Sequence, residues 1–399
     1  PAYLRAGGMM CIPIFEILFF TCFSLCVVKI IAGASPRWWV LAGILAGFGL
    51  LNKYSIAIWI IAVVLGLLLT PERRKLRGPW PWIGGAIAFL LFMPHLAWEV
   101  SHGWPTLEFL RLIRSDMLVH NSRLGFLLSQ VIFLHPISSC VWILGLGSMF
   151  TRRRKRYRAL GWAFLVFLVF FVVLRSKPYY PLPAYTVLFS AGSVQLEYLF
   201  NESRRSLILQ RTAGGLLILG GILGSFISLP ILPLVALDNI IVTLGRNKID
   251  PDDLTTEFHR QYGWEEFAGR VEEVYGTLSD DEQETCTILM LSYMQASAVN
   301  FYGHELPRAV SGHMNYYLWG PDPDRGAVAI TCGFSESRLL EIYGDVRLIN
   351  QNKILPWINS KYQNLPIYVC REPKSTLSEL WPTIKRYTHS DPAVWGSDH

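Results

Sequence analysis

Trp38 to Thr70 reads WWVLAGILAGFGLLNKYSIAIWIIAVVLGLLLT, an apolar stretch that is interrupted only by Asn52, Lys53 and Tyr54. A helix rises about 1.5 Å per residue and must cover a hydrocarbon core of about 30 Å, so each half of the stretch is short for a membrane crossing. The turn between the halves is therefore expected below the outer membrane surface. Polar backbone at that depth is tolerated where protein or a water-filled cavity surrounds it. We predict that Lys53 lines a recessed pocket.

Further apolar stretches on both sides predict a polytopic α-helical membrane domain. The sequence is 52% hydrophobic and 17% charged, with 14 Trp among 399 residues, which is apolar for a soluble protein. A crossing helix needs about 20 residues. We expect about eight spans, at residues 9–30, 38–52, 54–70, 80–98, 124–150, 159–174, 178–197 and 211–232.

Basic residues cluster in three loops, and an even number of the expected crossings separates each loop from the next. Short loops rich in Lys and Arg stay on the cytoplasmic side. The other polar loops, and everything after about residue 233, are therefore expected outside the cytoplasm. The clusters are Arg73, Arg74, Lys75 and Arg77; Arg152 to Arg158; and Arg204, Arg205 and Arg211.

The second part of the chain has the mixed charge and short apolar runs of a water-soluble domain. We predict a transmembrane domain over 1–232, a linker over 233–245 and a small extracytoplasmic α/β domain over 246–399, because strands alternate with helices there. Helices are expected at 264–278, 293–302, 336–343 and 377–387, and strands at 287–291, 327–332 and 366–370.

Charge and cysteine content narrow the classes of function. The net charge of +6 comes largely from the predicted cytoplasmic loops, which suits anionic membrane lipid, and no nucleic-acid-binding module is present. No cysteines have metal-ligand spacing, so the sequence does not indicate a metal or another cofactor. Cys286, Cys332 and Cys370 lie in the soluble part, where an apolar core role is favoured over a disulfide between two of them.

Lys53 is the first candidate for chemistry, because an ammonium group within an apolar stretch requires an anionic partner or a cavity. It would contact a phosphate at the membrane surface, or, as the alternative, extend to the interface from a short hairpin.

His95, Trp98, Glu99 and His102 follow at helical spacing, so one helix end would present both imidazoles and the carboxylate along one stripe. Such a group suits proton transfer or contact with a sugar hydroxyl. Metal binding is not favoured, since no further ligand is evident. An interfacial helix end is the alternative. The loop from 99 to 123 is expected to contain an amphipathic interfacial helix.

Two more groups of residues are candidates for substrate contact. Arg175 and Lys177 stand beside Tyr179 and Tyr180, an arrangement that suits a phosphate carrying a sugar, or a simple aromatic belt with flanking cations. The run from Ser311 to Gly320 is dense in polar and aromatic residues, which suits carbohydrate binding or a structural turn; its candidates are His313, Asn315, Tyr316 and Trp319.

Several motifs together resemble bacterial membrane glycosyltransferases of the GT-C class, akin to the protein mannosyltransferases and the aminoarabinose transferases of lipid A. The soluble tail is similar to the extracytoplasmic domain of some members. The motifs are GFGLLNKY at 47–54, MPHLAWE at 93–99 with HGWP at 102–105, KPYYPLPAY at 177–185, NFYG at 300–303, and the run 311–321.

The resemblance implies a sugar transfer from a polyprenyl-phosphate carrier to a lipid, glycan or protein acceptor outside the cytoplasmic (inner) membrane of a bacterium. Lys53 matches the family's Lys after the Gly-rich span, and Lys177 matches its basic residue before the paired tyrosines. Both would stabilise the phosphate charge that develops in the transition state.

The family's general base is an acidic residue in the first outer loop, and no such loop precedes the first span here. The chain starts at Pro1, so we expect a fragment whose catalytic base lies upstream, and we expect residues 1–399 alone to be inactive. Glu99 is the substitute to test. A transporter or flippase of lipid-linked saccharides is the alternative function, and a non-catalytic envelope scaffold is a third.

Overall fold

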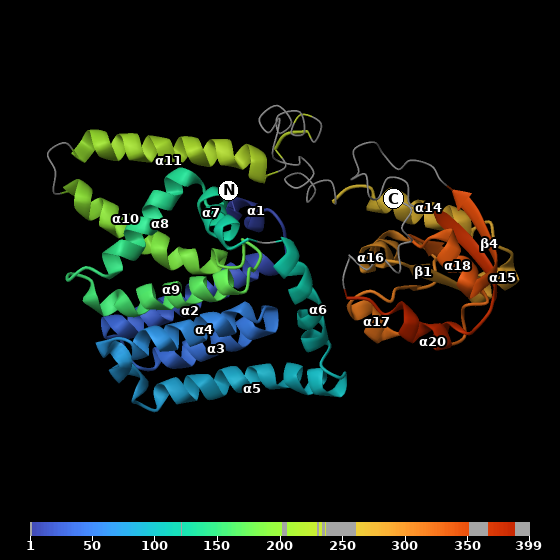
Figure 1. Ribbon diagram of the computed structural model, residues 1–399, viewed down its shortest axis with the longest axis horizontal. Coiled ribbons are helices and arrows are strands. Elements are labelled where there is room, and N and C mark those ends of the chain that lie inside the picture. The colour runs from blue at the N-terminus through green and yellow to red at the C-terminus, as the bar shows by residue number, and fades with distance from the viewer. Residues whose placement is uncertain are drawn as a thin grey trace. The chain divides into compact units, whose positions relative to one another are not determined.

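Apolar stretches in the first 230 residues fold into helices, which Figure 1 shows as a ribbon diagram of the computed structural model. The structure describes residues 2–120, 122–201, 206–229, 231–233, 236, 261–350 and 366–387. The helices are α1 (Ala2–Gly7), α2 (Ile12–Ala32), α3 (Trp38–Asn52), α4 (Ser55–Leu68), α5 (Trp80–Ser101), α6 (Pro105–His120), α7 (Arg123–Phe133), α8 (Pro136–Met149), α9 (Arg158–Val173), α10 (Tyr185–Asn201) and α11 (Ser206–Ser228), with 3-10 helices η1 (Pro71–Leu76), η2 (Lys155–Tyr157) and η3 (Leu182–Ala184).

The chain divides into two units, Pro1–Ile231 and Leu232–His399, called here the helical unit and the α/β unit. The predicted linker at 233–245 lies almost entirely outside the described residues, as do Arg204 and Arg205 of the third basic cluster.

The core of the helical unit lies among α2, α4 and α9. Trp59 of α4 is fully buried, and its ring packs against Phe20 of α2 and Phe167 of α9 at centroid distances of 6.1 and 5.2 Å. The indole N–H donates to the Ser24 hydroxyl at 3.0 Å. A buried Trp needs such a partner for its polar atom. These contacts fix the relative positions of three helices.

Glycines bring α3 and α5 into close contact. A Cβ atom at Gly43 would lie 2.1 Å from the carbonyl oxygen of Gly84, so a larger residue would force the two helices apart. Small residues at helix interfaces allow this approach in membrane proteins. This packing positions α5 relative to α3. It therefore positions His95 and Glu99, near the end of α5, relative to Lys53, which follows the end of α3.

Three helical segments of the described residues are long and apolar enough to cross a membrane: Ile12–Ala32, Trp80–Ser101 and Lys155–Val173. A bent pair, α7 with α8, would make four, and α3 and α4 are shorter apolar helices. The prediction of about eight spans is therefore not confirmed. The prediction of a mostly helical structure with several apolar helices is confirmed.

The predicted span at 124–150 is two helices. α7 and α8 meet at an angle of 104°, and His135 between them has a positive φ of 74°. Pro136 then occupies the first turn of α8, where its missing N–H costs nothing. Apolarity alone did not reveal this break.

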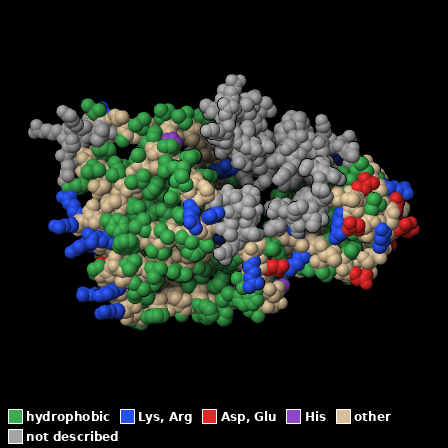
Figure 2. All heavy atoms as spheres, viewed as in Figure 1, with side chains coloured by type: hydrophobic (Ala, Val, Ile, Leu, Met, Phe, Trp, Pro, Cys, Tyr) green, Lys and Arg blue, Asp and Glu red, His purple; other side chains and the backbone are tan. Residues whose placement is uncertain are grey.

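Two of the predicted basic clusters lie at one end of the helical unit. The helices α2, α3 and α4 run back and forth, so η1, which follows α4, lies at the C-terminal end of α2 and contacts it, as does η2. Figure 2 shows Lys and Arg side chains gathered along one edge of this unit. The turn with Lys53 lies at the other end of α2, where the Asn52 side chain donates to the carbonyl oxygen of Ile12 at 3.2 Å.

The α/β unit contains a mixed five-stranded sheet in the order β2-β1-β3-β5-β4. β1 is parallel to β2 and β3, and β5 is antiparallel to β3 and β4. The elements are α14 (Trp264–Tyr275), α15 (Asp280–Thr285), β1 (Cys286–Met290), α16 (Tyr293–Tyr302), β2 (Ala309–Val310), α17 (Asn315–Trp319), β3 (Val328–Cys332), α18 (Glu336–Ile342), β4 (Tyr343–Asn350), β5 (Ile367–Pro373), α20 (Leu377–Leu380) and η4 (Trp381–Ile384).

The central strands are covered on both faces, because every residue of β1 and β3 is buried. Cys286, Cys332 and Cys370 are free thiols with no exposed surface, which confirms the predicted core role. Burial raises the pKa of Cys286 to about 12 and that of Cys370 to about 11. Both thiols therefore stay protonated and serve as apolar core groups.

The helices predicted at 264–278, 293–302 and 336–343 and the three predicted strands are confirmed within a few residues. The last predicted helix, 377–387, is wrong beyond Leu380, because Pro382 lies at the start of a separate 3-10 turn. The sequence analysis also missed β2 and β4.

Candidate functional site

Lys53 lies at the turn between α3 and α4 and pairs with a carboxylate from α2. Its ammonium nitrogen is 2.8 Å from Oε2 of Glu16, and the Ser55 hydroxyl donates to the other oxygen of the same carboxylate. The Glu16 side chain is 4% exposed and the Lys53 side chain 24%. A charge among apolar helices is stabilised by this kind of pairing.

Two tyrosines from a distant segment cover Lys53. The ammonium nitrogen lies 5.4 Å from the ring centroid of Tyr179 and 4.8 Å from that of Tyr180, within the range of cation–π contacts. The structure thus brings together residues that the sequence analysis selected separately. We call Lys53, Glu16, Ser55, Tyr179 and Tyr180 the Lys53 cluster.

Arg175 and Lys177 lie on the turn that leads from α9 to these tyrosines. Arg175 has a positive φ of 49°, and the buried Ser176 donates its N–H to the carbonyl oxygen of Phe171 at 3.1 Å. The N–H of Tyr180 donates to the carbonyl oxygen of Lys177 at 3.2 Å. Arg175 and Lys177 therefore lie on a tight turn that directly precedes Tyr179 and Tyr180 of the Lys53 cluster in the sequence.

A second cluster adjoins the first, since Tyr54 follows Lys53 directly. The Tyr54 hydroxyl bonds to Nε2 of His95 and lies 3.5 Å from Oε1 of Glu99. Glu99 is 2% exposed, and it accepts hydrogen bonds from the backbone N–H of Thr106, at 3.3 Å, and from the Thr106 hydroxyl. We call Tyr54, His95, Glu99 and Thr106 the Glu99 cluster.

The predicted stripe of His95, Glu99 and His102 forms only in part. Nε2 of His95 lies 3.5 Å from Oε1 of Glu99, whereas His102 caps the end of α5. The ring of His102 stacks on Trp98 at 4.4 Å, and its Nδ1 lies 2.9 Å from the Trp98 carbonyl oxygen. Among the described residues there is no group of three or more His, Cys, Asp or Glu side chains that would hold a metal ion.

Glu16 is the residue that the sequence analysis missed. An acidic side chain inside the predicted span 9–30 was itself a signal, because ionisable residues within a membrane are rare and tend to be functional. Thr106 and Ser55 had no comparable signal, since hydroxyl groups are common near helix ends.

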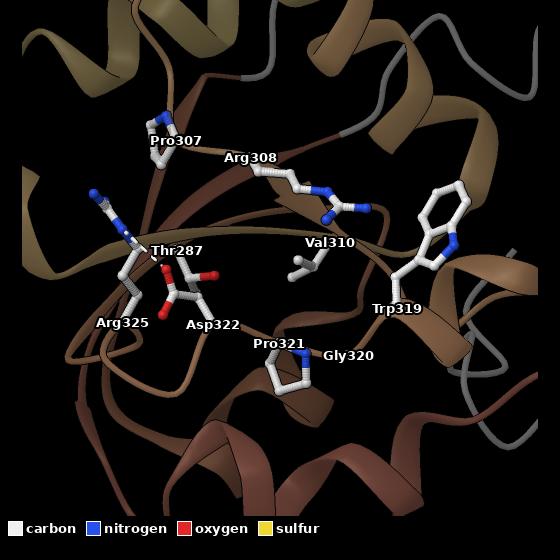
Figure 3. Close-up of a pocket in the computed structure, with 9 residues that line it drawn as sticks. All are labelled: Thr287, Pro307, Arg308, Val310, Trp319, Gly320, Pro321, Asp322 and Arg325. Atoms are coloured by element: carbon white, nitrogen blue, oxygen red, sulfur yellow. Dashed lines mark ion pairs between the residues drawn. The ribbon is translucent and has the colours of Figure 1, made fainter.

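The α/β unit contains a separate pocket of about 360 Å³ between the start of β1, the segment before β2, and the segment after α17. Figure 3 shows Arg308 extending toward Trp319 on one side and Asp322 with Thr287 on the other. Pro307, Val310, Gly320, Pro321 and Arg325 complete the lining.

Of the four candidates in the run from Ser311 to Gly320, Trp319 lines this pocket. His313 is fully buried, with Nδ1 at 3.4 Å from a guanidinium nitrogen of Arg386. The Tyr316 hydroxyl is 2.9 Å from the Ser297 hydroxyl and fixes α17 to α16. Asn315 begins α17 and is exposed. The run is therefore partly a structural turn.

Residues 3–98 match the family model described as dolichyl-phosphate-mannose-protein mannosyltransferase. The matched segment contains Glu16, Lys53 and His95. The match suggests a membrane glycosyltransferase of the GT-C type, which agrees with the resemblance of the motifs at the level of the family. No curated protein and no solved structure matches the chain.

Proposed function

We propose that this protein transfers a sugar from a polyprenyl-phosphate carrier to a lipid, glycan or protein acceptor outside the cytoplasmic membrane of a bacterium. The observation that carries the proposal is the Lys53 cluster, an ion pair held among apolar helices under two tyrosine rings. It lies in the segment that matches the mannosyltransferase family. It also lies at the end of α2 away from the basic turns η1 and η2, as an extracytoplasmic site requires.

Phosphate leaves such a carrier as an anion, so the site must stabilise negative charge as the glycosidic bond breaks. Lys53 supplies a point charge, and Arg175 and Lys177 on the neighbouring turn add to it. Glu16 acts as a positioning residue, because its carboxylate holds the ammonium group beside Tyr179 and Tyr180. When the phosphate binds, Lys53 interacts with both anions.

The acceptor hydroxyl must also lose a proton. Glu99 is too deeply buried, at 2% exposure, to reach an acceptor directly. His95 is 28% exposed at its side chain and lies within 3.5 Å of Glu99. Within this chain we assign His95 as the group that faces the acceptor and Glu99 as the residue that positions it.

The test measures binding and transfer separately. The protein is incubated with labelled polyprenyl-phosphate sugars and membrane acceptors. The variant E16L/K53M replaces the ion pair by apolar groups and is expected to bind the carrier at least about tenfold more weakly, the loss of one charge-assisted contact. K75M, in the basic turn η1, is the matched control and is expected to bind normally.

Two results would contradict the proposal. Carrier binding that is unchanged in the double variant would exclude the Lys53 cluster as the phosphate site. Passage of the labelled carrier across a vesicle with no labelled glycoconjugate formed would indicate a flippase. For the acceptor side of the reaction, H95Q is the decisive variant, and it is expected to lower transfer while carrier binding is retained.

A further inference from the structure

The pocket of the α/β unit combines a cation, an aromatic face and hydrogen-bonding oxygens. The guanidinium carbon of Arg308 lies 5.1 Å from the ring centroid of Trp319. In the part of the chain that the structure describes, no carboxylate pairs with Arg308, whereas Arg325 is 3.6 Å from Asp322. The Arg308 side chain is exposed and Trp319 is 57% exposed. A ligand can therefore reach both.

Hydrogen bonds hold both walls of this pocket in place, and such preorganisation favours binding. The Asn300 side chain accepts from the N–H of Ala309 at 2.8 Å and donates to its carbonyl oxygen at 2.9 Å. It thus fixes the residue that follows Arg308. Arg325 donates to the carbonyl oxygens of Gln283 and Cys286, at 3.2 and 3.0 Å. These bonds anchor the opposite wall to the start of β1.

The turn beneath the pocket depends on glycine. Gly320 ends α17 with a positive φ of 74°, a conformation that favours glycine. Pro321 follows, and its ring lines the pocket (Figure 3). The order of these residues places Trp319 on one side of the turn and Asp322 on the other.

We propose that this pocket binds a sugar unit that carries an anionic group, either a carboxylate or a phosphate. Arg308 has no carboxylate partner among the described residues, and its planar group can hold a carboxylate or phosphate through two parallel hydrogen bonds. Trp319, Pro307 and Pro321 present apolar surfaces to the C–H groups of a pyranose ring. Thr287 and Asp322 offer oxygens to its hydroxyls. The volume of about 360 Å³ lies at the small end of ligand pockets, which span roughly 300–1,000 Å³.

All residues of this pocket belong to the α/β unit, so the proposed sugar binding is independent of the transferase activity. A neutral sugar would leave Arg308 without a partner, and inorganic phosphate would not use the aromatic wall. The site is therefore expected to prefer a charged sugar to both a neutral sugar and inorganic phosphate. Simple electrostatic attraction would not produce the preference over inorganic phosphate. Both features of the ligand, the ring and the charge, are needed for full affinity.

The test titrates the purified full chain with four probes, glucuronic acid, glucose, glucose 6-phosphate and inorganic phosphate, with binding followed by ligand-detected NMR. At least one charged sugar is expected to bind about tenfold or more tightly than glucose, and glucose 6-phosphate more tightly than inorganic phosphate. The comparison of glucuronic acid with glucose 6-phosphate tells whether the carboxylate or the phosphate is preferred.

Variants assign the effect to residues. R308Q is expected to remove the preference for charged sugars, and W319A to weaken charged and neutral sugars alike. R347Q, at an exposed arginine on β4, and F301A, at an exposed aromatic residue of α16, are matched controls that should bind normally. Equal binding of glucose and the charged sugars, a preference that survives R308Q, or an unaltered affinity in W319A would each overturn the proposal.

Discussion

Lys53 and Arg308 are two cations in contact with aromatic rings, but their surroundings differ. Lys53 lies beside two tyrosines and is also paired with the buried carboxylate of Glu16. Arg308 lies beside Trp319, and among the described residues no carboxylate pairs with it. Both cations have the aromatic contact, whereas of the two only Lys53 has a carboxylate partner among the described residues.

The difference follows from solvation. An ammonium group among apolar helices loses its water and must be neutralised or held in a cavity. An exposed guanidinium keeps part of its hydration and can remain uncompensated, at little cost to the folded state. The countercharge of Lys53 thus meets a requirement of its apolar surroundings, while Arg308 can remain exposed until a ligand anion binds.

The largest effect is expected when Glu16 is replaced by leucine. The change leaves Lys53 as an unpaired charge among apolar side chains, and breaking a buried pair in this way costs about 3–5 kcal/mol. Because the Lys53 side chain is 24% exposed, we expect a destabilisation of about 3 kcal/mol, near the lower limit of that range. Thermal unfolding of the purified protein in detergent measures it.

The double variant E16L/K53M tests the reason for this loss. Replacing both partners of a buried pair by apolar groups is often neutral, so the double variant should recover most of the stability. E72Q, in η1 beyond the C-terminal end of α4, serves as the control for removal of a carboxylate. A double variant that is no more stable than E16L would show that Lys53 does not require a countercharge.

The sequence was sufficient to predict that Lys53 is unusual but not what neutralises it. A lysine within an apolar stretch is visible in the sequence, whereas its partner lies 37 residues earlier, on another helix. Which residue faces Lys53 depends on how α2, α3 and α4 pack. The same applies to Tyr179 and Tyr180, which were selected for their own pattern and reach Lys53 only through the tertiary fold.

Secondary structure was predicted best where one periodicity dominates. Helices such as Tyr293–Tyr302, with a capping Ser292, and buried strands such as β1 have clear local patterns. The two-residue strand β2 has none, because its pairing with β1 decides its structure. The break at His135 was hidden since apolar residues continue on both sides of it.

A smaller effect is expected for E99Q. The carboxylate of Glu99 accepts hydrogen bonds from the backbone N–H and the hydroxyl of Thr106 at the start of α6. The side-chain amide of Gln has one oxygen and one NH₂ group, so E99Q would place a donor against one of these two Thr106 donors. Leaving a buried donor without its acceptor costs about 1–3 kcal/mol. We expect faster hydrogen exchange at the first turn of α6 and little change in α2. S101A, which removes an exposed hydroxyl from the same helix end, should leave this exchange unaltered, and protection of α6 that persists in E99Q would exclude this role of Glu99.

The smallest effect is expected for the ion pair between Glu282 and Arg371 in the α/β unit, which joins α15 to β5 at 2.7 Å. Both side chains are more than a quarter exposed, so E282Q should cost only about 0.5–1 kcal/mol at neutral pH. The bond to Arg371 lowers the pKa of Glu282 below its ordinary value of 4.5. The folded state therefore gains stability from this group above pH 4.5, and the gain is lost as the pH falls through the lowered pKa.

The measurement compares the free energy of unfolding of the wild type and E282Q between pH 3 and 7. The difference between the two proteins should shrink as the pH falls. A difference that grows toward acid would reverse the assigned sign.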